Sequence, residues 1–240
     1  MIYLTGDLHG EIDLPKLDEF FVYAGKNLSR EDYVIILGDF GMIFGADTHI
    51  DYPWEENRVK EYFDEKYPWT TLFVDGNHEN FVHLNKFPTK DWNGGKVSVL
   101  SENCLWLHRG QVFTIENKTF FTMGGAYSID KPWRKPLISW WSQEDITDDD
   151  MKTGLLNLKA HGNKVDYILT HCAPYQIYFD IAMQEHFTIN SQEVSKNELY
   201  LQTINKTAKF KKWFFGHYHI NREFQDGKYV CLYNDIIPLE

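Results

Sequence analysis

Aspartate, asparagine and histidine residues stand directly after several short apolar runs of this sequence. The clusters are Gly6-Asp7-Leu8-His9-Gly10, Gly38-Asp39-Phe40-Gly41, Gly76-Asn77-His78-Glu79, Thr170-His171 and Gly216-His217-Tyr218-His219. Because the carboxyl ends of strands in an open α/β sheet meet at one edge, we expect these side chains to lie together. Mixed oxygen and imidazole donors suit Mn²⁺, Fe²⁺ or Zn²⁺. The pattern therefore favours a site for two divalent ions over five unrelated polar turns.

The elements that must position these residues alternate along the first part of the chain. Apolar, β-branched runs predict strands, and stretches with helical spacing separate several of them. The expected strands are 2–5, 33–37, 71–74, 105–107, 112–115, 119–123, 167–170, 213–215 and 229–232. The expected helices are 14–24, with Asp13 as its cap and Pro15 in its first turn, 55–67, 148–161 and 190–209. Closely spaced strands from Val97 to Met123, with hairpins at Asn117-Lys118 and Asp226-Gly227, indicate a mixed sheet or two packed sheets.

The composition indicates a globular protein with a strongly acidic surface. The 240 residues carry 24 Lys+Arg against 35 Asp+Glu, which gives a formal net charge of −11. This length can bury a sizeable core, and we expect one domain over residues 1–240. Since an acidic surface repels phosphate backbones, long nucleic acid is not an expected partner.

Cysteine use and hydropathy favour a soluble protein of a reducing compartment. Cys104, Cys172 and Cys231 are scattered and show no metal-binding or disulfide spacing. Apolar runs such as Val34 to Leu37 are far shorter than the roughly 20 residues of a membrane helix, and the first residues are typical of a strand. We therefore expect a cytoplasmic protein that does not interact with membranes.

The five clusters, in their order along the chain, resemble the calcineurin-like metallophosphoesterase superfamily. The resemblance extends from Asp7 to His219. It implies an α/β fold in which a sandwich of two mixed β-sheets is flanked by helices. This agrees with the strand pattern described above.

The resemblance also implies a role for each residue that matches the motif. Asp7, His9 and His219 would bind one metal ion, Asn77, His171 and His217 a second, and Asp39 would bridge the two. His78 would face the substrate and either stabilise the transferring phosphoryl group or protonate the leaving oxygen. Two ions about 3.5–4 Å apart need such an anionic bridge, and they acidify a bound water. We expect manganese, iron or zinc, with manganese the most suitable metal in vitro.

The second cluster differs from that of the protein phosphatases of this superfamily. They continue Gly-Asp into Gly-Asp-x-x-Asp-Arg-Gly, whereas this chain reads Gly38-Asp39-Phe40-Gly41-Met42-Ile43-Phe44. The aspartate that orients their catalytic histidine and the arginine that clamps phosphate are absent here. A protein phosphatase or a dinucleoside-tetraphosphate hydrolase is therefore disfavoured. The orienting partner of His78 is left open between Asp47 and a backbone carbonyl.

A further segment, Gly124 to Trp141, resembles a stretch of a bacterial and phage branch of the superfamily. Arg134 is a candidate to bind a substrate phosphate. Trp140 and Trp141 could stack on a leaving group, but we favour a role in covering the core. Cys172 is interpreted as a small buried residue, since the mechanism needs no thiol. The histidines outside the motif, His49, His83, His108, His161 and His186, are interpreted as structural or surface residues.

The resulting hypothesis is a phosphoesterase with a dinuclear metal site that hydrolyses a phosphomonoester or a phosphodiester by a metal-bound hydroxide. One alternative is a catalytically silent binding scaffold of the same fold. Another is a nuclease-type phosphodiesterase, which should show a basic groove, whereas basic residues cluster only at Lys206, Lys209, Lys211 and Lys212. A small phosphoester is the expected substrate. The oligomeric state, the native metal and the natural substrate are left open.

Overall fold

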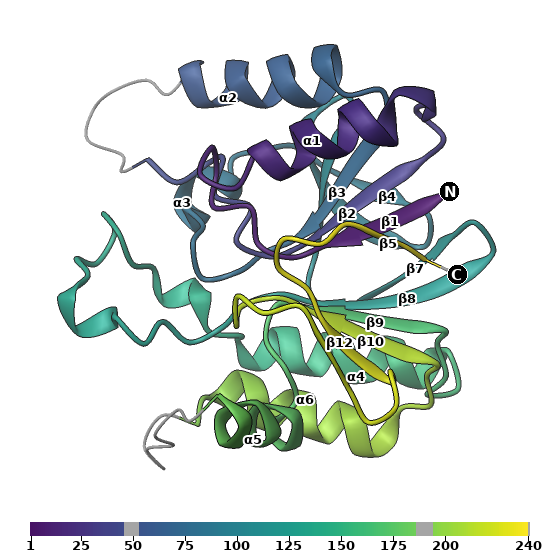
Figure 1. Cartoon of the computed structure of the whole chain (residues 1–240). Helices are drawn as coiled ribbons and strands as arrows, with labels where there is room; N and C mark the ends of the chain where they lie inside the picture. The colour runs from purple at the N-terminus through teal and green to yellow at the C-terminus, as the bar shows by residue number, and fades with distance from the viewer. Residues whose placement is uncertain (46–52, 186–193, 240) are drawn as a thin grey trace.

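Two β-sheets packed face to face form the centre of the computed structural model, which describes residues 1–45, 53–185 and 194–239 (Figure 1). The first sheet has the strand order β13-β1-β2-β3-β6-β5-β4 and the second β11-β12-β10-β9-β8-β7. The strands of the first sheet are β1 (Ile2–Thr5), β2 (Tyr33–Leu37), β3 (Thr70–Val74), β4 (Thr89–Trp92), β5 (Gly95–Ser101), β6 (Cys104–Leu107) and β13 (Ile237–Pro238). Those of the second are β7 (Gln111–Ile115), β8 (Lys118–Met123), β9 (Tyr167–Thr170), β10 (Lys212–Phe215), β11 (Arg222–Phe224) and β12 (Tyr229–Cys231).

Both sheets are parallel at their centres and antiparallel at their edges. Strands β1, β2, β3 and β6 pair in parallel, as do β8, β9, β10 and β12. The outer strands β13, β5, β4, β7 and β11 pair antiparallel. The parallel strands in each sheet run the same way, so their carboxyl ends share one edge of that sheet.

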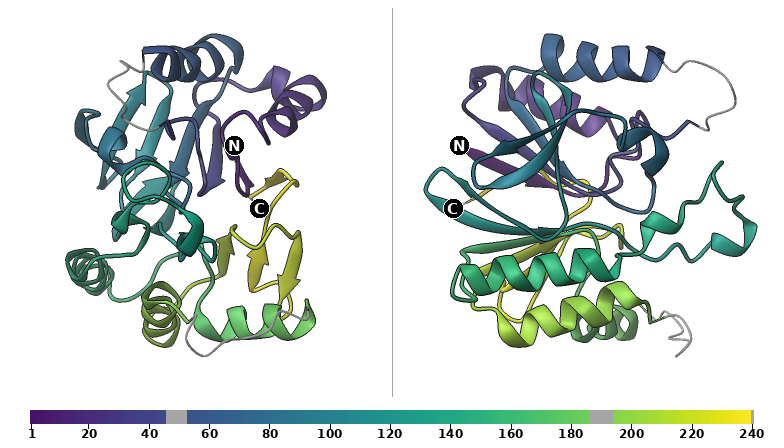
Figure 2. Two further views of the ribbon diagram at one scale, coloured as in Figure 1. Left: turned by 90° about the vertical axis from the view of Figure 1, so that its left-hand side faces the viewer. Right: turned by 180° about the vertical axis from the view of Figure 1, so that it is seen from behind.

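Helices cover the outer face of each sheet (Figures 1 and 2). The helices are α1 (Pro15–Tyr23), α2 (Pro53–Lys60) with a π-helical turn at Glu61–Lys66, α3 (Phe81–Leu84), α4 (Asp148–Ala160), α5 (Tyr175–Gln184) and α6 (Lys196–Thr207). Leu17 of α1 and Val59 of α2 share an apolar cluster with Val34 and Ile36 of the first sheet. Helices α4, α5 and α6 cover the second sheet in the same way. None of these helices is long and apolar enough to cross a lipid bilayer.

A third apolar cluster fills the space between the two sheets. Ile35 and Leu72 of the first sheet contact it from one side, and Leu169 and Phe214 of the second sheet from the other. Because the central strands are covered by helices on one face and by the other sheet on the other, they need apolar residues on both faces. This explains why β2 is a continuous apolar run, and why every residue of β3 and β9 is buried rather than every second one.

The expected α/β sandwich of two mixed sheets with flanking helices is confirmed, and each expected strand lies within two residues of an observed one. Two details of the expected helices are wrong. Leu14, not Asp13, is the N-cap of α1, because the Asp13 carboxylate is bound elsewhere. Helix α6 starts at Lys196, where Ser195 and Glu198 form a capping box, and residues 190–193 of the expected helix lie outside the described part of the chain.

A buried ion pair, which the sequence pattern did not indicate, holds the end of β3. Asp75 is fully buried and accepts hydrogen bonds from Arg109 Nε at 2.8 Å and Nη2 at 2.6 Å, and from Trp106 Nε1 at 3.0 Å. Arg109 also donates to the carbonyl oxygens of Gln143 and Asp145. The pair therefore joins β3 to the segment that follows β8.

We predict that Arg109→Met destabilises the fold by about 3–5 kcal/mol, because it leaves the Asp75 carboxylate buried without its cation. Urea unfolding at neutral pH measures this change. Lys96→Met, which removes an exposed cation from β5, is the matched control and should change stability by about 0.5 kcal/mol or less. Equal effects of the two substitutions would show that the pair does not contribute.

Candidate metal centre and active-site cavity

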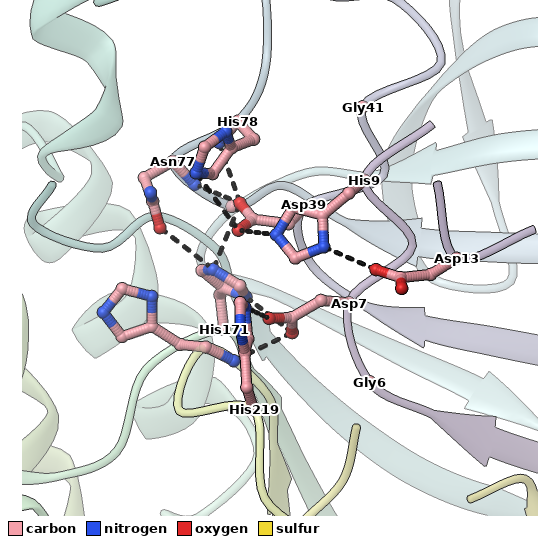
Figure 3. A network of polar contacts seen from close by, with 12 residues as sticks. Gly6, Asp7, His9, Asp13, Asp39, Gly41, Asn77, His78, His171 and His219 are labelled. Atoms are coloured by element: carbon pink, nitrogen blue, oxygen red, sulfur yellow. Dashed lines mark hydrogen bonds and ion pairs between the residues drawn. The ribbon is translucent and has the colours of Figure 1, made fainter. Parts of the chain in front are cut away.

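The five polar clusters of the sequence meet where the carboxyl ends of the strands of both sheets come together (Figure 3). Asp7 and His9 follow β1, Asp39 follows β2, and Asn77 and His78 lie beyond β3. From the second sheet, His171 follows β9, and His217 and His219 follow β10. Within the described residues, three groups have potential ligand atoms within 4.8 Å of one another: Asp7, His9 and His219; His9, Asp39 and His78; Asp39, His171 and His217.

Two buried carboxylates tie the loops of this centre together. Asp39 Oδ1 accepts hydrogen bonds from the backbone N–H groups of Asn77 at 2.7 Å and His78 at 2.8 Å. Asp7 Oδ1 accepts one from the backbone N–H of His217 at 2.8 Å. Since His217 belongs to the other sheet, the Asp7 carboxylate also joins the two sheets.

Two of the imidazoles are oriented by hydrogen bonds at Nδ1. His9 Nδ1 donates to Asp13 Oδ2 at 2.7 Å, and His171 Nδ1 donates to the Leu37 carbonyl oxygen at 2.8 Å. The Nε2 atom of each ring then lies 3.2 Å from Asp39. This is the arrangement in which a histidine presents Nε2 to a metal ion. The sequence pattern assigned Asp13 to a helix cap and missed its contact with His9.

The buried carboxylates favour the protonated, positively charged forms of His9 and His171. Burial alone would lower the pKa of His171, but the charge and hydrogen bond of Asp39, the charge of Asp7 and the Leu37 carbonyl together outweigh burial and raise that pKa to about 10. Burial would also lower the pKa of His9, but its hydrogen bonds to Asp39 and Asp13, together with the charges of Asp39 and Asp7, raise it to about 9. Burial and the charge of His171 act together on His217 and lower its pKa to about 3. Burial opposes ionisation of Asp39, yet His171, His9 and His78 together keep its pKa well below the ordinary value.

The residues present fit divalent cations. His219 Nε2 lies 3.1 Å from Asp7 Oδ2, but not in hydrogen-bonding geometry, so this buried oxygen has no hydrogen-bond donor among the described residues. Two glycines allow the carboxylates to approach the backbone closely: a Cβ at Gly76 would lie 2.1 Å from Asp39 Oδ1, and one at Gly216 would lie 2.2 Å from Asp7 Oδ1. A buried carboxylate oxygen without a donor, surrounded by imidazoles, is typical of a metal ligand.

His78 lies beside Arg134 at the edge of this centre. Arg134 Nη2 is 2.8 Å from His78 Nε2, and Arg134 Nη1 donates to the Asn77 carbonyl oxygen at 3.3 Å. Arg134 Nε is held by Asp130 at 2.7 Å. Burial lowers the pKa of His78, and Arg134 adds to this while Asp39 opposes it. Asp47, one expected partner of His78, lies outside the described residues.

A cavity of about 700 Å³ opens above the centre. It is lined by Asp39, Asn77, His78, Tyr127, Ile129, Asp130, Arg134, Tyr178, Glu198, His217, Tyr218 and His219. The tyrosines and Glu198 were not among the expected site residues. Tyr127 and Tyr218 lie in segments that the motif and the Gly124–Trp141 stretch already marked, whereas nothing in the local sequence marks Tyr178 and Glu198. The lining thus combines three tyrosines with three imidazoles and Arg134.

The residues interpreted as structural lie apart from this cavity. Trp141 is fully buried in the cluster under the first sheet, and Cys172 is buried under the second. Trp140 is half-buried, with Lys131 over its ring. His83 contacts Glu56, His108 contacts Ser98 and His161 contacts the Asn157 carbonyl, whereas His49 and His186 lie outside the described residues.

Comparisons with known proteins agree with this geometry. The profile of the calcineurin-like phosphoesterase family matches residues 1–221. A lariat debranching enzyme of Schizosaccharomyces pombe is 25% identical over 92% of this chain and 51% of that protein. One of Entamoeba histolytica is 25% identical over 94% of this chain and 66% of that protein. The chain therefore spans between one half and two thirds of the length of these curated relatives.

A solved structure, described as that of a candidate 5′-nucleotidase from Staphylococcus aureus, is 16% identical to this chain with a TM-score of 0.47. The match covers 96% of this chain and 48% of that one. A likeness of this degree carries no conclusion about activity.

The expectation of a small phosphoester substrate and no nucleic-acid partner is wrong. Both curated relatives are named for acting on lariats, which are branched RNA. The expectation rested on the net charge of −11, which sums the whole chain. A substrate instead meets the local charges, and the cavity is lined by Arg134 and by the imidazoles of His78, His217 and His219.

We predict that Gly76→Ala weakens Mn²⁺ binding by about tenfold or more, because the added Cβ displaces Asp39 from its place between His9 and His171. Calorimetric titration of the purified variant measures the affinity. Gly162→Ala is the matched control, since its Cβ would meet no atom within 4 Å; its φ of +64° should cost stability but not metal affinity. Unchanged affinity in Gly76→Ala would contradict the placement of Asp39.

Proposed function

Since this chain belongs to the calcineurin-like phosphoesterase family and is therefore a metal-dependent phosphoesterase, we propose that it hydrolyses a phosphodiester bond in nucleic acid. The observation that carries the proposal is the lining of the cavity: four of the candidate metal ligands, Asp39, Asn77, His217 and His219, line it together with His78 and Arg134, where a phosphate group would meet them. The lariat debranching enzymes among its relatives favour a diester of RNA over a free monoester.

We propose two metal positions that share Asp39. Asp39 belongs to two of the three groups of metal-binding type, which supports a bridging role. Asp7, His9 and His219 would complete one position, and Asn77, His171 and His217 the other. When bound, the ions would supply positive charge to the phosphate oxygens and acidify the attacking water.

His78 and Arg134 would act on the same phosphate group. In the free protein the Arg134 guanidinium donates to His78 Nε2, so this nitrogen is unprotonated and the neutral ring carries its proton on Nδ1. A phosphate oxygen would compete for the guanidinium, and His78 Nε2 would then be free to bind a proton given up by the attacking water and pass it to the leaving oxygen. Asp130 would keep the guanidinium at the cavity wall throughout.

We predict that His78→Ala lowers the rate of diester hydrolysis by about 10²–10⁴-fold while the protein retains its metal, because only proton transfer is lost. Asp39→Asn should lose both hydrolysis and metal content, since it removes the charge shared by the two positions. The measurements are the rate on bis-p-nitrophenyl phosphate and the metal content by mass spectrometry. His161→Ala, which removes a histidine at the end of α4, is the control. Full turnover in both site variants would refute the mechanism.

The substrate class is tested with matched substrates. The Mn²⁺-loaded protein should hydrolyse bis-p-nitrophenyl phosphate faster than p-nitrophenyl phosphate, and it should cleave branched RNA faster than linear RNA of the same composition. A preference for the monoester would exclude the phosphodiesterase. Hydrolysis of the small diester without cleavage of either RNA would exclude nucleic acid.

A further inference from the structure

The side-chain amide of Asn77 lies between two groups that contact its opposite ends. Its Oδ1 is 3.1 Å from His171 Nε2, on the side of the candidate centre (Figure 3). Its Nδ2 donates to Ser128 Oγ at 3.2 Å, on the other side. The two ends of an amide have nearly the same shape, so packing alone does not decide which end faces the centre. Only the oxygen end can bind a metal ion.

Ser128 decides which end of the Asn77 amide faces the centre, because the Ser128 hydroxyl proton is already donated to another residue. Its hydroxyl donates to Glu144 Oε2 at 2.5 Å, and both residues are almost completely buried. A hydroxyl has one proton, so Ser128 Oγ then presents only lone pairs to Asn77. A lone pair accepts from Nδ2 and repels Oδ1, which leaves Oδ1 turned toward His171.

Glu144 is in turn held in place from two sides. Its Oε1 accepts a hydrogen bond from the Trp141 backbone N–H at 3.2 Å and lies 3.7 Å from Arg134 Nη1. Burial raises the pKa of Glu144 and outweighs the opposing effects of Ser128 and Arg134, so that the resulting pKa is about 7. The carboxyl group is therefore mostly ionised in a mildly alkaline buffer. An ionised carboxylate accepts hydrogen bonds only, which sets the direction of the Ser128 bond.

We propose that Ser128 and Glu144 are positioning residues that hold the Asn77 amide with its oxygen toward the metal centre. The inference rests on the proposed function in one respect, namely that Asn77 ligates a metal ion. It extends that function to two residues outside the metal-binding motif, which follow Asn77 by 51 and 67 positions along the chain. Neither residue lines the cavity or belongs to a group of metal-binding type.

The first test is the Mn²⁺ affinity, measured by calorimetry in a mildly alkaline buffer. Ser128→Ala should weaken it by about 10–100-fold, the usual effect of losing a residue that orients a ligand. Glu144→Gln should also weaken it, because its amide can donate to Ser128 and turn the hydroxyl proton toward Asn77 Oδ1. Ser142→Ala, an exposed serine beside the same turn, is the matched control and should stay within about twofold of the wild type.

A second test separates orientation from a general loss of structure. In an Asn77→Asp background both side-chain ends are oxygen, so orientation no longer matters. Adding Ser128→Ala there should change the Mn²⁺ affinity by less than about twofold. An equal loss in both backgrounds, or no loss in either, would overturn the inference.

A third measurement does not depend on metal or activity. In the metal-free protein, nuclear magnetic resonance should show slow exchange of the Asn77 Nδ2 protons with water, and Ser128→Ala should make it fast. Equal exchange in the two proteins would overturn the inference. A protein that shows the predicted exchange and affinities but hydrolyses no phosphodiester would overturn the proposed function alone.

Discussion

The structure depends on two carboxylates, Asp7 and Asp39, that are buried at the ends of adjacent strands and bonded to the backbone of neighbouring loops. Asp39 holds the loop after β3, and Asp7 holds the loop after β10, in the other sheet. The carboxylate oxygens lie so close to the backbone of these loops that a Cβ atom at position 76 or 216 would collide with them. Glycine is therefore required at Gly76 and Gly216. The apolar cluster between the sheets brings their strands together face to face. The two carboxylates then fix how the loops at the strand ends meet, and so fix the geometry of the candidate centre.

The charge of these carboxylates also decides what the centre attracts. In the described structure, His9 and His171 balance Asp39, and their raised pKa values reflect that balance. Divalent ions would supply the same positive charge and would require both rings to be neutral. The buried carboxylates Asp7 and Asp39 therefore favour cation binding at the centre, whatever the net charge of the whole chain. The local charges of the site are consistent with the relatives named as lariat debranching enzymes, whereas the net charge of the whole chain led to the wrong expectation about nucleic acid.

The segment after β8 supports the centre from outside the motif. Arg134 contacts His78 and the Asn77 carbonyl, and Ser128 contacts the Asn77 amide. Glu144 contacts both Arg134 and Ser128, so a single buried carboxylate connects the residues that contact Asn77 and His78. The burial of Trp141 holds this segment against the first sheet, which gives the tryptophan a structural rather than a stacking role.

The sequence by itself determined the fold class and the motif residues, because the strands are continuous apolar runs and the polar residues follow them at once. A parallel sheet brings such strand ends to one edge whatever the other details are. Only the tertiary structure decided that Asp13 bonds to His9 rather than capping α1, that Asp75 pairs with Arg109, and that Glu144 accepts a hydrogen bond from Ser128. These are contacts between side chains whose partners lie on other turns, loops or strands. A carboxylate has no local signal for its partner, because the choice depends on which donor the packed chain leaves within hydrogen-bond distance.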